Sequence, residues 1–286
     1  SGESLIRAKA EWKAGEFMLS ASSPHVDMPL IWNGLRPLDD HRAWHAWLAS
    51  MQGGVASDAR AELAFAWAAP WKAQPSGSEW DSLQYPVTAH VEHADISLGL
   101  GQDAVVHTEA DVELDQTGLK AIVVSTELPH AIGVAKGGLS ISWDSLLLKI
   151  TGTAEADTGR LHAWLAADEA TQISWSAAAA ATEFSIKWMP KEELPRSAIL
   201  HLKPLTPWSL EVKNIPVEVS SGEVVWQLDE GIRFNKLLWA TPHLSGKADL
   251  VAKRGDSGAW KIVSMEAHAE GPLSRLVGHF HLPIES

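Results

Sequence analysis

The chain has 286 residues and no cysteine. This absence excludes disulfide bonds, thiolate metal sites and a cysteine nucleophile, so burial and hydrogen bonding must stabilise the fold. No apolar run approaches the roughly 20 residues of a membrane-spanning helix. Basic residues are also few, with 23 Lys and Arg against 36 Asp and Glu, and the formal charge is −13. Because this charge repels a phosphate backbone, we expect no nucleic-acid partner.

Familiar catalytic motifs are missing as well. The sequence contains no GxSxG elbow, phosphate-binding loop, HExxH pair or dinucleotide fingerprint. We therefore predict a protein that is not an enzyme and that needs no cofactor.

Tryptophan, in contrast, is abundant: 15 Trp stand beside one Tyr and five Phe. One interpretation is that these rings fill the faces of a sheet, where each buries roughly 150–250 Å². The other is that a row of rings lines a groove for sugars or acyl chains. The sequence leaves both open.

Period-two alternation of apolar and polar residues recurs along the whole chain and predicts an all-β fold. We expect a large antiparallel, curved or sandwich-like sheet array. The clearest strand is 105–115, where Val106 and every second residue to Leu114 oppose His107 and a row of acids to Asp115. Strands are predicted at 6–13, 86–98, 104–115, 119–128, 139–150, 159–166, 171–176, 183–188, 198–203, 208–219, 223–228, 232–239, 246–253 and 259–269.

One helix is expected, at about 39–51. Asp39 or Asp40 can cap it, an apolar stripe includes Met51, and Gly53–Gly54 ends it. The loop-like residues 74–78 then separate an N-terminal segment with this helix, 1–73, from a main β domain, 79–286, unless the two form one continuous domain.

Histidine and carboxylate groups offer only weak sites. His41 and His45 lie four apart on the predicted helix and are the best metal candidates, but such a pair is more often a surface feature, so we predict no metal. The acidic face from Glu109 to Asp115 could serve glycoside hydrolysis or bind calcium. We interpret it more simply as a solvated strand face.

Amphipathic strands joined by small turn motifs recur in the segments Ser221–Leu228, Leu244–Leu250, Ala259–Ile262 and Ala267–Leu273. These segments resemble AsmA/TamB-like periplasmic envelope proteins, and the resemblance covers about the latter two thirds of the chain. It implies an inner-membrane-anchored periplasmic protein, with the anchor upstream of residue 1, whose sheet carries lipid in a hydrophobic groove. A second resemblance is to the type II secretion N component, also a periplasmic β protein.

This resemblance implies that one sheet face stays apolar and open to a ligand. The residues available for such a groove are Ile141, Trp143, Val224, Trp226, Leu228, Trp260 and Ile262. Two alternatives stay open: a structural component of a secretion or surface assembly that binds envelope proteins, and a carbohydrate-binding protein or carbohydrate-active enzyme.

Overall fold

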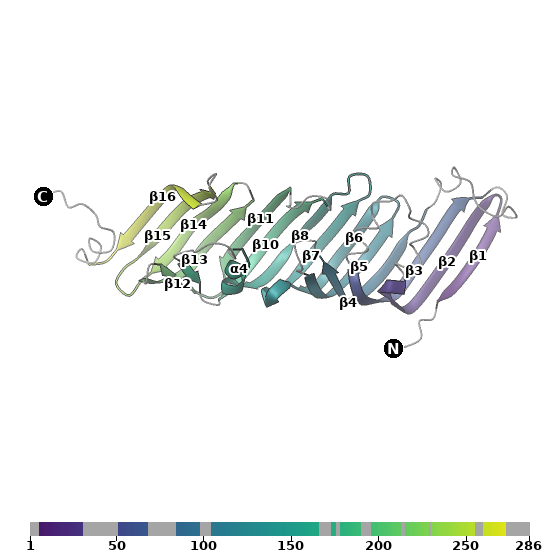
Figure 1. The fold of residues 1–286 in the computed structure, drawn as a ribbon, viewed down its shortest axis with the longest axis horizontal. Helices are drawn as coiled ribbons and strands as arrows, with labels where there is room; N and C mark the ends of the chain where they lie inside the picture. Colours follow the sequence, from purple (N-terminus) through teal and green to yellow (C-terminus); the bar gives the residue numbers. More distant parts are fainter. Residues whose placement is uncertain are drawn as a thin grey trace. The chain divides into compact units, whose positions relative to one another are not determined.

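A computed structural model describes ten segments of the chain: residues 6–30, 51–67, 84–97, 104–165, 173–175, 178–189, 196–212, 215–228, 230–254 and 260–272. The fold is all-β, as predicted, and within these segments sixteen strands form one antiparallel sheet (Figure 1). The described helices are the 3₁₀ turn η2 (Pro129–Ala131) and α4 (Thr158–Leu165). Neither is long and apolar enough to cross a membrane.

The strands follow one another in the sheet almost in chain order. The order is β1-β2-β3-β4-β5-β6-β7-β8-β10-β11-β13-β14-β15-β16, and β12 pairs with β13 and β9. The strands are β1 (Arg7–Lys13), β2 (Glu16–Asp27), β3 (Met51–Ala66), β4 (Val87–Ser97), β5 (Ala104–Asp115), β6 (Gly118–Glu127), β7 (Gly133–Ser142), β8 (Leu148–Asp157), β9 (Ile173–Trp175), β10 (Ala179–Trp188), β11 (Ser197–Pro204), β12 (Trp208–Val212), β13 (Ile215–Gln227), β14 (Gly231–Ala240), β15 (Ser245–Arg254) and β16 (Trp260–Glu270).

The chain divides into two compact units. Unit 1 comprises residues 1–129, 135–151 and 187–196, and unit 2 comprises residues 130–134, 152–186 and 197–286. Residues on both sides of the expected seam at 74–78 belong to unit 1, where β3 and β4 pair directly.

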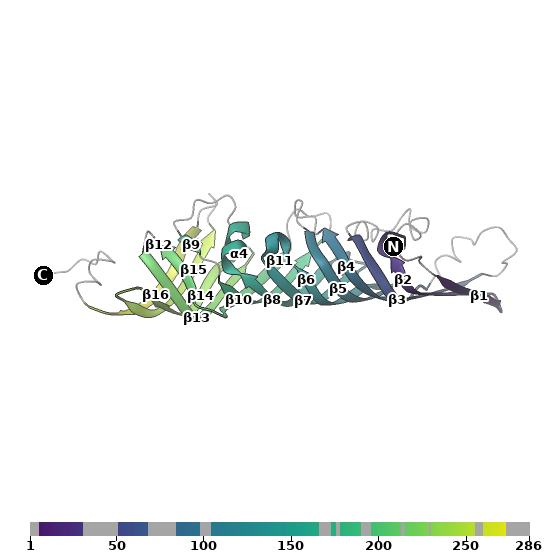
Figure 2. The ribbon, with the colours of Figure 1, turned by 90° about the horizontal axis from the view of Figure 1, so that it is seen from below.

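The core of unit 1 lies on one face of its strands, which Figure 2 shows side by side. Leu114 and Leu119 from neighbouring strands are buried there with Ile141, Leu148 and Trp188. A second cluster gathers around Ala56 and Val91, and includes Val26, Met28 and Ala94. As the sequence predicted, the alternation of apolar and polar residues places the apolar side chains on one face.

The short hairpin between β5 and β6 depends on one carboxylate. Asp115 Oδ1 accepts hydrogen bonds from Thr117 N at 2.7 Å, Thr117 Oγ1 at 2.6 Å and Gly118 N at 3.1 Å. These bonds to the charged form, those from Thr117 foremost, lower the pKa of Asp115. Asp115, the last residue of β5, therefore also holds the turn that follows the strand.

Several local predictions were wrong. The predicted strand at 159–166 is helix α4: Asp157 Oδ1 accepts the Arg160 N–H at 2.9 Å and caps the first turn, and Leu161 is buried. The ranges 139–150 and 208–219 each span the end of one strand and the start of the next.

The predicted C-terminal boundary of the helix at 39–51 was wrong. Met51 begins β3, and Gly53 and Gly54, at φ +67° and +85°, lie inside that strand. Residues 39–50, with His41 and His45, lie outside the described residues.

Strict alternation also fails where strands bulge. In β5 the register against β6 shifts between Val106 and Glu109, and His107 adopts φ +51°. As a result Val105 is buried, whereas the sequence predicted Val106 on the apolar face. From Thr108 to Leu114 the predicted alternation is confirmed.

Candidate ligand-binding face and histidine clusters

In unit 2, residues directly opposite one another on neighbouring strands build two apolar rows. Opposed residues of an antiparallel pair share a face, so each row lies on one face across five strands. The first row is Leu202, Val224, Phe234, Leu250 and Met265; the second is Leu200, Trp226, Ile232, Ala252 and Ile262. We call this the apolar face of unit 2.

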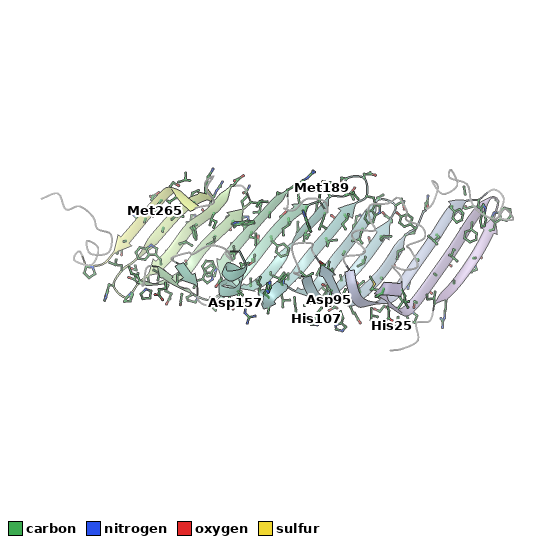
Figure 3. All side chains as sticks on the ribbon, viewed as in Figure 1. His25, Asp95, His107, Asp157, Met189 and Met265 are labelled. Carbon is green, nitrogen blue, oxygen red and sulfur yellow. The ribbon has the colours of Figure 1, made fainter. Side chains whose placement is uncertain are left out.

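Both rows end in exposed side chains on β16, although exposure does not rise steadily along the second row, where Ala252 on β15 is 8% exposed. In the first row, Leu202 and Val224 are 9% and 7% exposed, whereas Met265, labelled in Figure 3, is 62% exposed. In the second row, Ile262 on the same strand is 63% exposed. The β11 end of the first row is therefore packed, and at β16 both rows leave apolar side chains in solvent.

The apolar face of unit 1 is held by aromatic side chains. Trp143 packs against the buried cluster and its Nε1 donates to the Asp115 carbonyl at 2.7 Å. Farther along the strands, Phe17, Phe65 and Trp67 form a group with ring centroids 5.2–5.7 Å apart. Phe17 and Trp67 are only half-buried, so these rings belong in part to the core and in part to the surface.

The predicted groove residues divide between the two units. Ile141 and Trp143 belong to unit 1, and Ile141 is buried. Val224, Trp226, Leu228 and Ile262 belong to unit 2. Val224, Trp226 and Ile262 belong to the two rows, and Leu228 does not. Trp260 is the first residue of β16, and its side chain lies outside the described residues.

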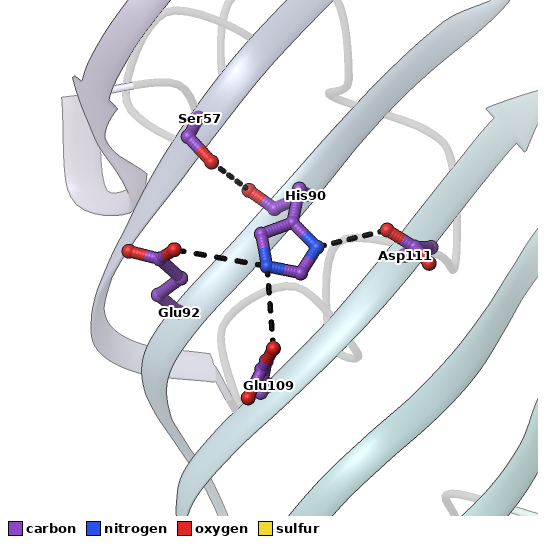
Figure 4. Close-up of polar contacts among 5 residues, drawn as sticks. All are labelled: Ser57, His90, Glu92, Glu109 and Asp111. Carbon is purple, nitrogen blue, oxygen red and sulfur yellow. Dashed lines mark hydrogen bonds and ion pairs between the residues drawn. The ribbon is translucent and has the colours of Figure 1, made fainter.

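A histidine lies among three carboxylates on the opposite, polar face of unit 1 (Figure 4). His90 Nδ1 is 2.8 Å from Asp111 Oδ1, and its Nε2 lies 3.6 Å from Glu109 Oε1 and 3.7 Å from Glu92 Oε1. Ser57 Oγ donates to the His90 carbonyl at 3.5 Å. Two acids of the face that the sequence predicted as solvated, Glu109 and Asp111, thus lie against an imidazole.

The hydrogen bond to Asp111 is the main cause that raises the pKa of His90, and the negative charges of Asp111, Glu109 and Glu92 act in the same direction. Burial of the ring opposes them. Sequence reasoning missed this cluster because His90 and Asp111 lie on different strands, and only the β4–β5 register sets them opposite.

Unit 2 contains a related arrangement. His201 Nδ1 of β11 lies 3.0 Å from Glu223 Oε1 of β13, and Asn235 Nδ2 of β14 donates to Glu223 Oε2 at 3.4 Å. The hydrogen bond from His201 is the main cause that lowers the pKa of Glu223. Both arrangements link side chains of neighbouring strands. Among the described residues, no three His, Asp or Glu side chains are placed to hold a metal ion.

Bulges in both units are stabilised in the same way. His107 in β5 and Lys236 in β14 have positive φ, at +51° and +50°. The N–H of His107 donates to Asp95 on β4 at 3.2 Å, and the N–H of Lys236 donates to Asp249 on β15 at 2.9 Å. Figure 3 labels Asp95 and His107 side by side. A carboxylate on the neighbouring strand thus satisfies the amide at each bulge.

Comparisons with protein-family models, curated proteins and solved structures found no match to the chain.

Proposed function

We propose that the chain is a non-catalytic β module of the bacterial periplasm that holds a lipid or another amphiphile on its apolar face. The observation that carries this proposal is the apolar face of unit 2, where two cross-strand rows end in largely exposed Met265 and Ile262. Covering such side chains with an acyl chain removes apolar surface from water, at roughly 25 cal/mol per Å².

The strand arrangement supports this proposal. All sixteen described strands belong to one sheet, so no second described sheet packs against the apolar rows. The resemblance to AsmA/TamB-like proteins agrees with a sheet of this kind. The charge of −13 favours a neutral or zwitterionic amphiphile over an anionic one.

Native mass spectrometry with lipid extraction on the purified chain tests the proposal, with phosphatidylethanolamine added as the probe. We expect near-stoichiometric adducts. A chain that carries no amphiphile and does not bind the added probe would contradict the proposal and favour a module that binds envelope proteins.

Two serine substitutions locate the site. Because each removed side chain contributes on the order of 1 kcal/mol of apolar contact, Ile262→Ser with Met265→Ser should weaken probe binding about tenfold or more. Ile122→Ser is the matched control: Ile122 is 68% exposed but lies on the polar face of β6, opposite Asp111. Equal loss in both variants would place the amphiphile elsewhere.

A further inference from the structure

The strands β1 and β16 stand at the two ends of the order of the described strands. Within the described residues, β1 pairs only with β2 and β16 pairs only with β15. The outer backbone N–H and C=O groups of such strands can pair with a further strand. A strand that pairs with one of these edges must match its pattern of charged and apolar side chains.

Both edges have one apolar and one charged side. On β1, Ala10 and Trp12 lie opposite Leu19 and Phe17 and share their face, so Lys9, Glu11 and Lys13 lie on the other face. On β16, Met265 lies opposite Leu250, and Ala267 and Ala269 continue that apolar face. Glu266, His268 and Glu270 occupy the opposite face and are exposed.

The charges of the two edges are complementary in one antiparallel register. Placing Lys9 opposite Glu270 sets Glu11 opposite His268 and Lys13 opposite Glu266. The same register places Ala10 opposite Ala269 and Trp12 opposite Ala267, so apolar residues meet on the other face. Opposite charges at directly facing positions stabilise a strand pair, and like charges destabilise it.

We propose that copies of this chain associate head to tail, with β1 of one copy added to β16 of the next. A pair of two β16 edges centred on His268 fits less well, because this register sets Glu266 against Glu270. The head-to-tail contact is heterologous, so it leaves a free edge at each end and generates open chains of copies. It also continues the sheet from one copy to the next.

Charge reversal with cross-complementation tests this contact on the full chain by sedimentation velocity. The wild type should form a concentration-dependent ladder of oligomers that shortens at high salt. Lys9→Glu with Lys13→Glu, and separately Glu266→Lys with Glu270→Lys, should each weaken self-association at least about tenfold. Mixing the two variants should restore the ladder, because every junction then joins opposite charges.

A control for the lysine reversal carries the same charge change as Lys9→Glu with Lys13→Glu but away from the edges. Lys136→Glu with Lys149→Glu reverses two exposed lysines on β7 and β8 and should associate as the wild type does. A wild type that stays monomeric, or edge variants that do not complement each other, would overturn the proposal. Lipid binding by the monomer is a separate measurement, so the two proposals can fail independently.

Discussion

Stability should fall unequally when residues at the two ends of one apolar row are truncated. Leu202→Ala removes a side chain that is 9% exposed, so lost transfer energy and the cavity should together cost about 2–5 kcal/mol. Met265 is 62% exposed. Since roughly a third of its surface is buried and full burial of such a side chain contributes about 1.5–3 kcal/mol, Met265→Ala should cost about 1 kcal/mol or less.

Urea unfolding followed by far-ultraviolet circular dichroism measures both costs, with the slope m required to stay constant. Because both residues lie in one row of unit 2, the comparison does not depend on unit 1. If Met265→Ala cost as much as Leu202→Ala, the row would be packed along its whole length. The β16 end of the row would then not be open to a ligand.

Two further substitutions test local interactions. Because the folded-state pKa of His90 is raised, its ion pairs stabilise the fold below the unfolded pKa of about 6.5 and this contribution is lost as the pH rises through the folded pKa. His90→Gln should therefore lower the free energy of unfolding by about 0.5–1 kcal/mol more at pH 5 than at pH 8, and a pH-independent cost would contradict this. Gly222→Ala should cost more than about 1 kcal/mol in thermal or urea unfolding, because Gly222 has φ +127° and an added Cβ would lie 2.6 Å from Leu237 Cδ2. Gly138→Ala, whose Cβ meets nothing nearer than 3.9 Å, is the control and should cost clearly less.

The sequence predicts strands best where one face is apolar and the other charged. The predicted strand 104–115 coincides with β5, and the range 246–253 lies within β15. In both ranges, the alternation of apolar and polar residues is a stronger signal than any helical spacing. The all-β fold follows from the same signal repeated along the chain.

Helix α4 shows where this signal becomes ambiguous. Leu161, Trp164 and Leu165 fit a helical spacing as well as they fit part of an alternating strand. The deciding contact is the cap from Asp157, supported by Arg160 Nη1 donating to the Ala131 carbonyl at 3.0 Å. The second contact joins residues 29 positions apart, so local pattern does not reveal it.

The candidate sites depend on register, and a slip of two residues would leave the alternation of faces unchanged. His90 meets Asp111 only because β4 and β5 pair in one particular register. The apolar rows of unit 2 likewise need the pairing of five strands, although the resemblance to AsmA/TamB-like proteins already implied Val224, Trp226 and Ile262 as candidates for an apolar face.

Bulges explain how these faces stay apolar along strands whose alternation is interrupted. In β4, Val91 and Ala94 are both buried although they are three residues apart, because His93 bulges at φ +55° between them. In β5, Val105 and Thr108 are buried on either side of His107 in the same way. Each bulge shifts the inward-facing set by one residue, so the buried side chains before and after it stay on one face. The positive φ of His107 is unfavourable for a non-glycine residue, but the hydrogen bond from its N–H to Asp95 offsets part of that cost. Removing the Asp95 carboxylate would therefore disturb the continuity of the apolar face in addition to breaking this hydrogen bond.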